Sequence, residues 1–221
     1  MNNSVIVSLR DIVVEFDGQR ILDGLNLDIH DKEFVTLLGS SGCGKTTTLR
    51  LIAGFLEPTS GKVLLKGEDI TGVPPYKRPV NTVFQKYALF PHLNVFENVA
   101  FGLRLKKMDE ETIRRKVRDM LEVVGLKGFE RRSIGQMSGG QQQRVAVARA
   151  IAAHPPLILA DEPTGNLDTR AGAKVFEIIR ALHAEGNTIV LITHDEGLAR
   201  KAQRIVRITD GKIDDGEREV F

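Results

Sequence analysis

The sequence reads Gly39-Ser40-Ser41-Gly42-Cys43-Gly44-Lys45-Thr46-Thr47 between an apolar run at 34–38 and a helical pattern that continues to residue 53. Its spacing fits G-x-x-x-x-G-K-[ST] in the strand–loop–helix context that this motif requires. Glycines let the backbone bend so that successive N–H groups face one concavity, and the helix that follows adds its positive end. We therefore predict a phosphate-binding loop, in which Lys45 reaches the β- and γ-phosphates of a nucleotide and Thr46 binds Mg²⁺.

The bulk composition narrows the class of protein. A chain of 221 residues can form one α/β domain, with or without a small subdomain. With 31 basic and 29 acidic residues the net charge is +2, which gives no electrostatic case for nucleic acid as a partner. Cys43 is the single cysteine, so no internal disulfide can form. We find neither a secretion signal nor an apolar run near the ~20 residues of a membrane span, and expect a cytoplasmic domain.

Strand and helix patterns alternate along the chain. Alternating residues at 5–9 and 25–29 flank a turn at Asp17-Gly18 and predict strands with one solvated face. The further strands are expected at 34–38, 62–65, 80–83, 157–160 and 188–193, with a hairpin at 204–213. Helices are expected at 95–105, 109–124, 139–152 and 169–184 and from Asp195, and Glu57–Gly61 is expected to end the first helix. The charge of 109–124 indicates a solvated helix face.

This alternation predicts an α/β fold with a mostly parallel sheet and crossover helices. We assign residues 1–85 and 136–221 to the core, which includes an antiparallel β subdomain at its edge. Residues 86–135 form an inserted helical subdomain in this interpretation. The whole chain is then one nucleotide-binding domain.

Two carboxylates stand at the end of an expected buried strand, in Leu157-Ile158-Leu159-Ala160-Asp161-Glu162. In parallel sheets of this kind, ligands bind beyond the carboxyl ends of the strands. Asp161 is therefore placed to hold Mg²⁺, and Glu162 to accept a proton from an attacking water. An apolar run that ends in two acids is common, so the phosphate-binding loop in the same chain is what favours this interpretation over surface or helix-capping acids.

A second motif reads Ser138-Gly139-Gly140-Gln141, followed by Gln-Gln-Arg at 142–144. Ser138 is a plausible N-cap, and the two glycines leave the start of the helix open to an anion. The chain thus has two helix ends that can bind phosphate. Here the sequence resembles the ATP-binding cassette (ABC) family, whose signature is Leu-Ser-Gly-Gly-Gln. Met137 takes the place of the leucine, a conservative apolar difference.

The resemblance covers essentially the whole chain in the family's motif order, and it implies a mechanism. In that family two cassettes pair head to tail, and the signature of one closes on the ATP held by the loop of the other. It therefore implies ATP and Mg²⁺ as cofactors, ATP hydrolysis, a homodimer or paired cassette, and transmembrane permease subunits as partners. The chain would be peripheral on the inner face of the cell membrane.

Further site residues follow by matching motif positions. Phe16 matches the aromatic that stacks on adenine, although an edge-strand core Phe would look the same. Gln85 matches the Q-loop glutamine, which senses Mg²⁺, and His194 matches the switch histidine at the γ-phosphate. Asp168 matches the D-loop, or it caps the next helix. The predicted catalytic residues are Lys45, Gln85, Glu162 and His194; the metal-binding residues are Thr46, Gln85 and Asp161; the nucleotide-binding residues are Phe16, Gly39, Ser40, Ser41, Gly42, Cys43, Gly44, Lys45, Thr46, Thr47, Ser138, Gly139, Gly140, Gln141 and Asp168.

Different parts of the chain resemble two different subfamilies. Residues 34–106, above all 74–85 and 87–93, are similar to the ATPases of spermidine/putrescine importers. Residues from about 157 onward, notably 159–168 and 210–213, are similar to lipoprotein-release and macrolide-export ATPases. We expect a transporter subunit for polyamine import. The alternative of a lipoprotein-release, macrolide-export or cell-division-type complex stays open, as does a nucleotide-binding module without turnover.

Overall fold

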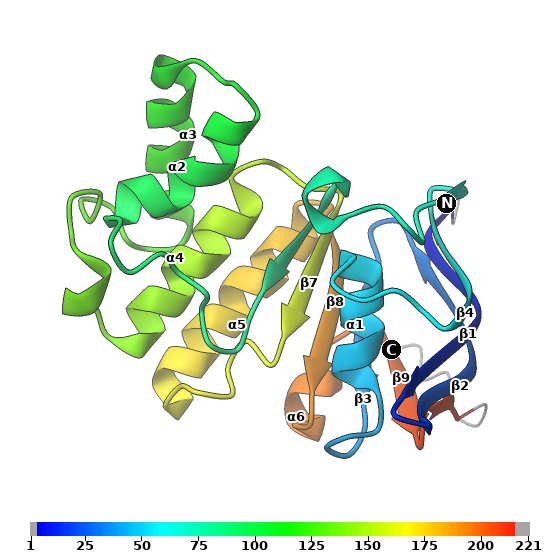
Figure 1. Cartoon of the computed structure of the whole chain (residues 1–221). Coiled ribbons are helices and arrows are strands. Elements are labelled where there is room, and N and C mark those ends of the chain that lie inside the picture. The colour runs from blue at the N-terminus through cyan, green and yellow to red at the C-terminus, as the bar shows by residue number, and fades with distance from the viewer. Residues whose placement is uncertain (1–3, 215–221) are drawn as a thin grey trace.

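A computed structural model describes residues 4–214 (Figure 1). Its centre is a six-stranded sheet with the order β10-β9-β3-β8-β7-β6. These strands are β3 (Phe34–Leu38), β6 (Val80–Val83), β7 (Leu157–Asp161), β8 (Thr188–Thr193), β9 (Arg204–Thr209) and β10 (Lys212–Ile213). Neighbouring strands from β9 to β6 are parallel, and only β10 pairs antiparallel, with β9. The carboxyl ends of five strands therefore meet at one edge.

A second sheet is antiparallel, with the order β2-β1-β4-β5. It consists of β1 (Val5–Phe16), β2 (Gln19–His30), β4 (Ser60–Leu65) and β5 (Glu68–Asp69). β1 and β2 form a hairpin whose two-residue turn is Asp17-Gly18. Both turn residues have positive φ, 48° and 78°, as a hairpin turn that follows the strand twist requires. The predicted antiparallel edge is confirmed.

The helices are α1 (Lys45–Ala53), α2 (Val95–Leu105), α3 (Glu110–Val123), α4 (Gly139–Ile151), α5 (Thr169–Ala184) and α6 (Glu196–Ala199), with 3₁₀ turns at Pro75–Lys77 and Ile134–Gln136. Short polar side chains begin most of them. The residues Asn94, Asp109, Ser138, Asp168 and Asp195 each accept a hydrogen bond from an amide in the first turn of α2 to α6. Such caps satisfy amides that have no partner within the helix.

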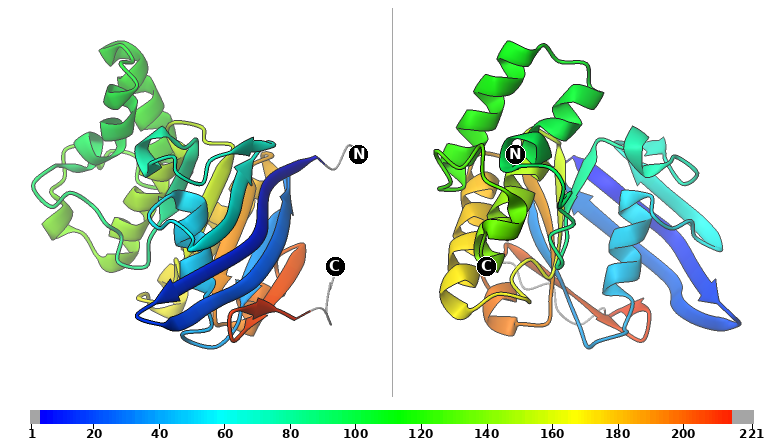
Figure 2. Two further views of the ribbon diagram at one scale, coloured as in Figure 1. Left: turned by 45° about the vertical axis from the view of Figure 1, so that its right-hand side comes forward. Right: turned by 60° about the vertical axis from the view of Figure 1, so that its left-hand side comes forward.

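Two apolar cores lie on opposite faces of the parallel sheet. Alternate residues of β3, β7 and β8 belong to different cores: Val35, Leu157 and Val190 pack on one side, and Phe34, Ile158 and Ile189 on the other. On the first side, α1 lies between the parallel sheet and the antiparallel sheet; on the second, α4 and α5 cover the sheet (Figures 1 and 2). Because both faces are covered, these strands have the unalternating apolar sequence that predicted them.

α2 and α3 extend beyond the sheet and pack on α4 (Figure 1). Buried side chains of all three helices belong to one core, together with the residues of α5. The assignment of 86–135 as a separate inserted subdomain stays a prediction. In the part of the chain that the structure describes, we find no helix that is both long enough and apolar enough to cross a membrane.

Three elements differ from the expectation. α1 ends at Ala53, before Glu57, because Gly54 adopts φ 81° and its N–H bonds back to Arg50 and Leu51 carbonyls. The helix expected from Asp195 is the four-residue α6. β9 and β10 form the expected hairpin, but β9 also joins the parallel sheet beside β3.

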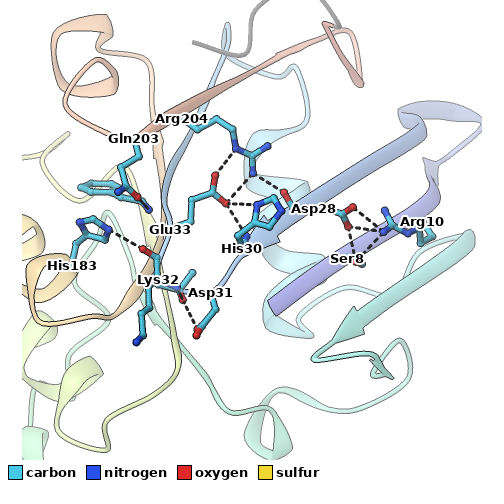
Figure 3. Close-up of polar contacts among 12 residues, drawn as sticks. Ser8, Arg10, Asp28, His30, Asp31, Lys32, Glu33, His183, Gln203 and Arg204 are labelled. Carbon is cyan, nitrogen blue, oxygen red and sulfur yellow. Dashed lines mark hydrogen bonds and ion pairs between the residues drawn. The ribbon is translucent and has the colours of Figure 1, made fainter. Parts of the chain in front are cut away.

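Polar contacts join the two sheets at the amino ends of the parallel strands (Figure 3). Arg204, at the start of β9, donates to both carboxylate oxygens of Glu33, at 2.5 and 3.0 Å, and to the Asp28 carbonyl oxygen at 2.6 Å. The side chains of Arg204 and Glu33 are only 15% and 12% exposed. This shielded ion pair holds β9 against the turn between β2 and β3.

Candidate functional site

The loop 39–44 connects β3 to α1 at the carboxyl edge of the parallel sheet (Figure 1). α1 begins at Lys45, and its N-cap is Gly44, which has φ 109° and no side chain to satisfy the first amide groups. These N–H groups and the positive end of the helix are therefore free to bind an anion. The expected order of strand, loop and helix is present, and phosphate binding by the loop stays a prediction.

Two glycines of this loop leave no room for a side chain. A Cβ on Gly44 would stand 2.5 Å from Leu22 Cδ2 in the β1–β2 hairpin, and one on Gly39 would stand 2.3 Å from the Ile208 carbonyl oxygen. The hairpin thus packs directly on the loop. Phe16, at the end of β1 in the same hairpin, is 47% exposed, so an adenine base could stack on its ring. It is not a core phenylalanine, which was the alternative.

Lys45 lies within the curl of the loop and is only 7% exposed. Its ammonium donates to the carbonyl oxygens of Gly39 and Ser40, both at 2.7 Å, and has a weaker contact of 3.7 Å with Cys43 Sγ. An ammonium has three N–H donors. The third N–H of Lys45 has only the weak sulfur acceptor in the described part of the chain, so this is the N–H that can donate to a phosphate oxygen instead.

Arg78 completes the support of α1 at its other end. This arginine, which the motif analysis did not single out, is 6% exposed and donates to the carbonyl oxygens of Leu51 and Ile52 in the last turn. It also bonds the carbonyls of Ile70, Thr71 and Val73. Burial lowers its pKa. A cation at the carboxyl end stabilises the helix dipole whose positive end faces the loop.

Asp161 ends β7, beside the start of α1. Its Oδ1 accepts a hydrogen bond of 3.3 Å from the Thr46 hydroxyl. Burial raises the pKa of Asp161 above its ordinary value, although the Thr46 hydroxyl and the nearby charges of Arg50 and Lys45 lower it. A hydroxyl and a carboxylate are hard oxygen ligands of the kind that Mg²⁺ uses together with phosphate oxygens and water. The described residues contain no cluster of three or more His, Cys, Asp or Glu that could hold a metal alone.

Glu162 and His194 form a hydrogen-bonded pair. They follow neighbouring parallel strands, β7 and β8, and His194 Nδ1 donates to Glu162 Oε1 at 2.8 Å. The Glu162 side chain is 15% exposed and that of His194 is 71% exposed. Glu162 has φ 45°, and its N–H bonds to the Ile192 carbonyl oxygen at 3.0 Å. A left-handed conformation is unfavourable for this residue type, and such residues cluster at functional sites.

Gln85 lies next to this pair. It follows β6, which pairs with β7, and its carbonyl oxygen accepts a 3.0 Å bond from Asn166 Nδ2. A Cβ on Gly165 would stand 2.9 Å from Gln85 Nε2. The parallel sheet therefore places Gln85 beside the segment that follows Glu162. Its role at Mg²⁺ stays a prediction.

Ser138 begins α4 with a reciprocal capping box. Its Oγ accepts from the Gln141 N–H at 3.3 Å, and Gln141 Oε1 accepts from the Ser138 N–H at 3.0 Å. A Cβ on Gly140 would stand 2.7 Å from Ala171 Cβ of α5, and one on Gly139 would stand 2.7 Å from the Tyr87 hydroxyl, the movable end of a side chain. Packing therefore restricts the residue at position 140, and access for an anion stays a prediction for both glycines.

The two predicted phosphate sites do not meet within one chain. The start of α4 and the loop between β3 and α1 lie at different places in the molecule (Figure 1), and among residues 4–214 no hydrogen bond or ion pair joins 138–141 to 39–47. Asp168 caps α5 by accepting from the Ala171 N–H at 2.9 Å, which was one of its two readings.

The chain matches the family model described as ABC transporter over residues 22–165. The chain belongs to the ABC transporter family. It is 54% identical over 197 residues to the spermidine/putrescine import ATP-binding protein PotA of Acetivibrio thermocellus, and 51% identical over 210 residues to PotA of Desulfitobacterium hafniense. These alignments cover 89% and 94% of this chain but 56% and 60% of the relatives, so the chain spans little more than half of their length.

Solved ABC cassettes share the fold. The dimeric structure of the cassette MJ0796 is 34% identical, with a TM-score of 0.86 over 97% of this chain and 98% of that one. The same protein bound to ADP and Pi gives the same TM-score and identity over 98% of this chain and 100% of that one. The ABC cassette is thus an α/β nucleotide-binding fold, and the predicted fold class is confirmed. Similarity to PotA extends well beyond residues 34–106, where the sequence first indicated it.

Proposed function

We propose that this cassette hydrolyses ATP as the energy-supplying subunit of a polyamine importer. The observation that carries the proposal is the gathering of the phosphate-binding loop, Asp161, the Glu162–His194 pair and Gln85 at one edge of the sheet, with the Ser138 helix end held apart. An isolated nucleotide-binding site has no need of the second helix end.

The loop and α1 hold the nucleotide. Lys45 and the first amides of α1 bind the phosphates, and Phe16 stacks on the base. Thr46 and Asp161, with Gln85 nearby, would hold Mg²⁺, which when bound neutralises charge on the β- and γ-phosphate oxygens. The remaining residues from Ser40 to Thr47 contribute their amide groups to the same concavity.

Glu162 is the proposed general base. Water attacks the γ-phosphorus and forms the new P–O bond, the bond from that phosphorus to the β–γ bridging oxygen breaks, and ADP leaves with the bridging oxygen. Glu162 takes the proton of the water. His194 keeps one carboxylate oxygen in place through its Nδ1–H, so the other is free to face the water. Little covalent chemistry falls to the protein, whose main contributions are position and electrostatics.

Pairing completes the site. We propose that two copies close head to tail, so that the Ser138 Oγ and the first amides of α4 from one copy bind the γ-phosphate held by Lys45 of the other. The dimeric form of a cassette 34% identical to this chain supports that arrangement. Asp168 lies at the start of α5, next to Gly140 through Ala171, and is proposed to contact the facing copy.

The proposed cargo follows from relatives. The relatives named as spermidine/putrescine import ATP-binding proteins are 46–54% identical to this chain. Co-purification of the chain with its permease in a membrane preparation, followed by an ATPase assay with externally presented solutes, tests this. Spermidine or putrescine should stimulate phosphate release, and stimulation by a peptide, a lipoprotein or a macrolide instead would contradict polyamine import while leaving ATP hydrolysis intact.

A further inference from the structure

Gln143 is a fully buried glutamine on α4, outside the five signature positions 137–141. Its Nε2 donates to the Pro163 carbonyl oxygen at 2.7 Å and to the Phe84 carbonyl oxygen at 3.3 Å. Pro163 directly follows Glu162, and Phe84 directly precedes Gln85. One amide group therefore joins the two backbone segments that carry the proposed base and the proposed Mg²⁺-sensing side chain.

The orientation of this amide is determined by its surroundings. Two carbonyl oxygens face the nitrogen, so a rotated amide would place oxygen against oxygen. The Oε1 atom is buried and has no hydrogen-bond partner among the described residues. An unpaired buried acceptor destabilises the folded state, and each such group calls for an explanation. The two hydrogen bonds that Nε2 donates explain why this amide is retained, since they hold the segments of Gln85 and Glu162 together.

A second side chain of α4, that of Arg149, bonds to the segment that follows β6, a few residues beyond Gln85. Arg149 donates to the carbonyl oxygens of Ala88 at 2.8 Å and Tyr87 at 3.3 Å. Both of these residues have positive φ, 49° and 58°. Tyr87 in turn places its hydroxyl against Gly139 at the start of α4. The helix that presents Ser138 to the facing copy is thus attached at two places to the segment after β6.

We propose that Gln143 is a positioning residue for ATP hydrolysis, which sets the spacing between Gln85 and Glu162 and links both to the start of α4. This proposal rests on the hydrolytic function argued above. A shift of either segment would move the carboxylate relative to the attacking water without changing the loop that holds the nucleotide. Misplacement by about 1 Å can reduce turnover by a factor of ~100.

Gln143→Met keeps the length of the side chain and removes both donors. We expect kcat for ATP hydrolysis to fall by a factor of about 10 to 100, with KM and the Kd of a fluorescent ATP analogue within about threefold of wild type. The stability effects oppose each other, because the variant removes the unpaired oxygen but leaves the Pro163 carbonyl without this donor. We therefore expect a change in Tm of no more than a few degrees.

Asn187→Leu is the control. Asn187 precedes β8, at the opposite end of that strand from His194, and its Nδ2 donates to the Leu182 carbonyl oxygen at 2.8 Å, so the variant removes one side-chain donor to the backbone away from the proposed site. Its kcat should stay within about threefold of wild type. Gln143→Leu removes the same hydrogen bonds with a side chain of different shape, and its kcat provides a second measurement if the methionine variant does not fold.

The outcomes separate the two proposals. A selective fall of kcat in both Gln143 variants supports the positioning role. Wild-type kcat in Gln143→Met, an equal fall in Asn187→Leu, or a loss confined to KM would overturn it while the hydrolytic function stands. A wild-type protein that binds ATP and releases no phosphate, even with its permease, would overturn the proposed function and this inference together.

Discussion

At the scale of single residues, the protonation of Asp161 depends on its surroundings. Its pKa is raised above the value in an unfolded chain, and burial of the carboxyl is the main cause. The folded state therefore favours the protonated carboxyl. The resulting contribution to stability is present below the ordinary pKa and is lost as the pH rises through the raised value. A bound cation would reverse this preference, because it stabilises the carboxylate.

Asp161→Asn should separate these effects. Without nucleotide, the variant should have a Tm a few degrees above wild type at pH 8, because it lacks the buried carboxylate. The difference should shrink as the pH falls through the raised pKa of the wild-type carboxyl toward its ordinary value, because both proteins then carry an uncharged group at this position. Thermal unfolding between pH 4 and 8 measures this. In the same assay Mg·ATP should stabilise wild type but not the variant. A pH-independent difference would refute the argument from burial.

Glu162→Gln keeps the shape of the side chain and its acceptor for His194, but it cannot take a proton. We expect ATP binding near wild type and phosphate release slower by a factor of about 10² to 10⁴, the usual contribution of a general base. Equilibrium binding and steady-state phosphate release measure the two quantities. Wild-type turnover with normal binding would rule out Glu162 as the base.

At the scale of elements, the sequence predicts those strands and helices whose bounds are determined by a local pattern of residues. The buried strands β3, β7 and β8 are continuous apolar runs, and the helix at 169–184 was expected within those same bounds. Chemistry that depends on pairs of elements was not predicted. Nothing in the sequence shows that His194 bonds to Glu162, 32 positions away. Nor does it show that Gln143, the third of three consecutive glutamines, bonds to the segments that follow β6 and β7.

Local signals also misjudge boundaries. Gly54 ends α1 by adopting a left-handed conformation, and a single glycine in a helical pattern does not announce this. β9 reads as one arm of a hairpin, since its parallel pairing with β3 joins residues about 169 positions apart. The motif residues were the most predictable part of the site, because phosphate binding constrains residue type and spacing together.

The ion pair between Arg204 and Glu33 makes an element-scale prediction. Arg204→Leu should lower the free energy of unfolding by about 3 kcal/mol, because it leaves a largely buried carboxylate without its arginine and with only His30 as a donor among the described residues. Arg10→Leu is the control, since Arg10 pairs with Asp28 at the surface, where such pairs contribute about 1 kcal/mol or less. Urea denaturation measures both. Equal losses would contradict the difference in burial, and ATP binding should change in neither.

At the scale of the whole molecule, the fold provides two halves of different sites. The carboxyl edge of the sheet holds the loop of Lys45, and the start of α4 presents Ser138 elsewhere on the chain. A head-to-tail pair of identical chains brings these surfaces together twice, so a symmetric dimer has two equivalent nucleotide sites. Each site then takes its loop from one copy and its helix end from the other.

Complementation between two inactive variants tests this claim most directly. Lys45→Ala removes the loop lysine, and Ser138→Arg blocks the helix end, so each variant alone should release almost no phosphate. In a mixed dimer both changes fall on one site, and the other site is unaltered. An equal mixture should therefore recover about a quarter of wild-type phosphate release, because half of the dimers are mixed and each has one intact site of two. A mixture that binds ATP and stays as inactive as either variant alone would contradict a nucleotide shared between facing copies.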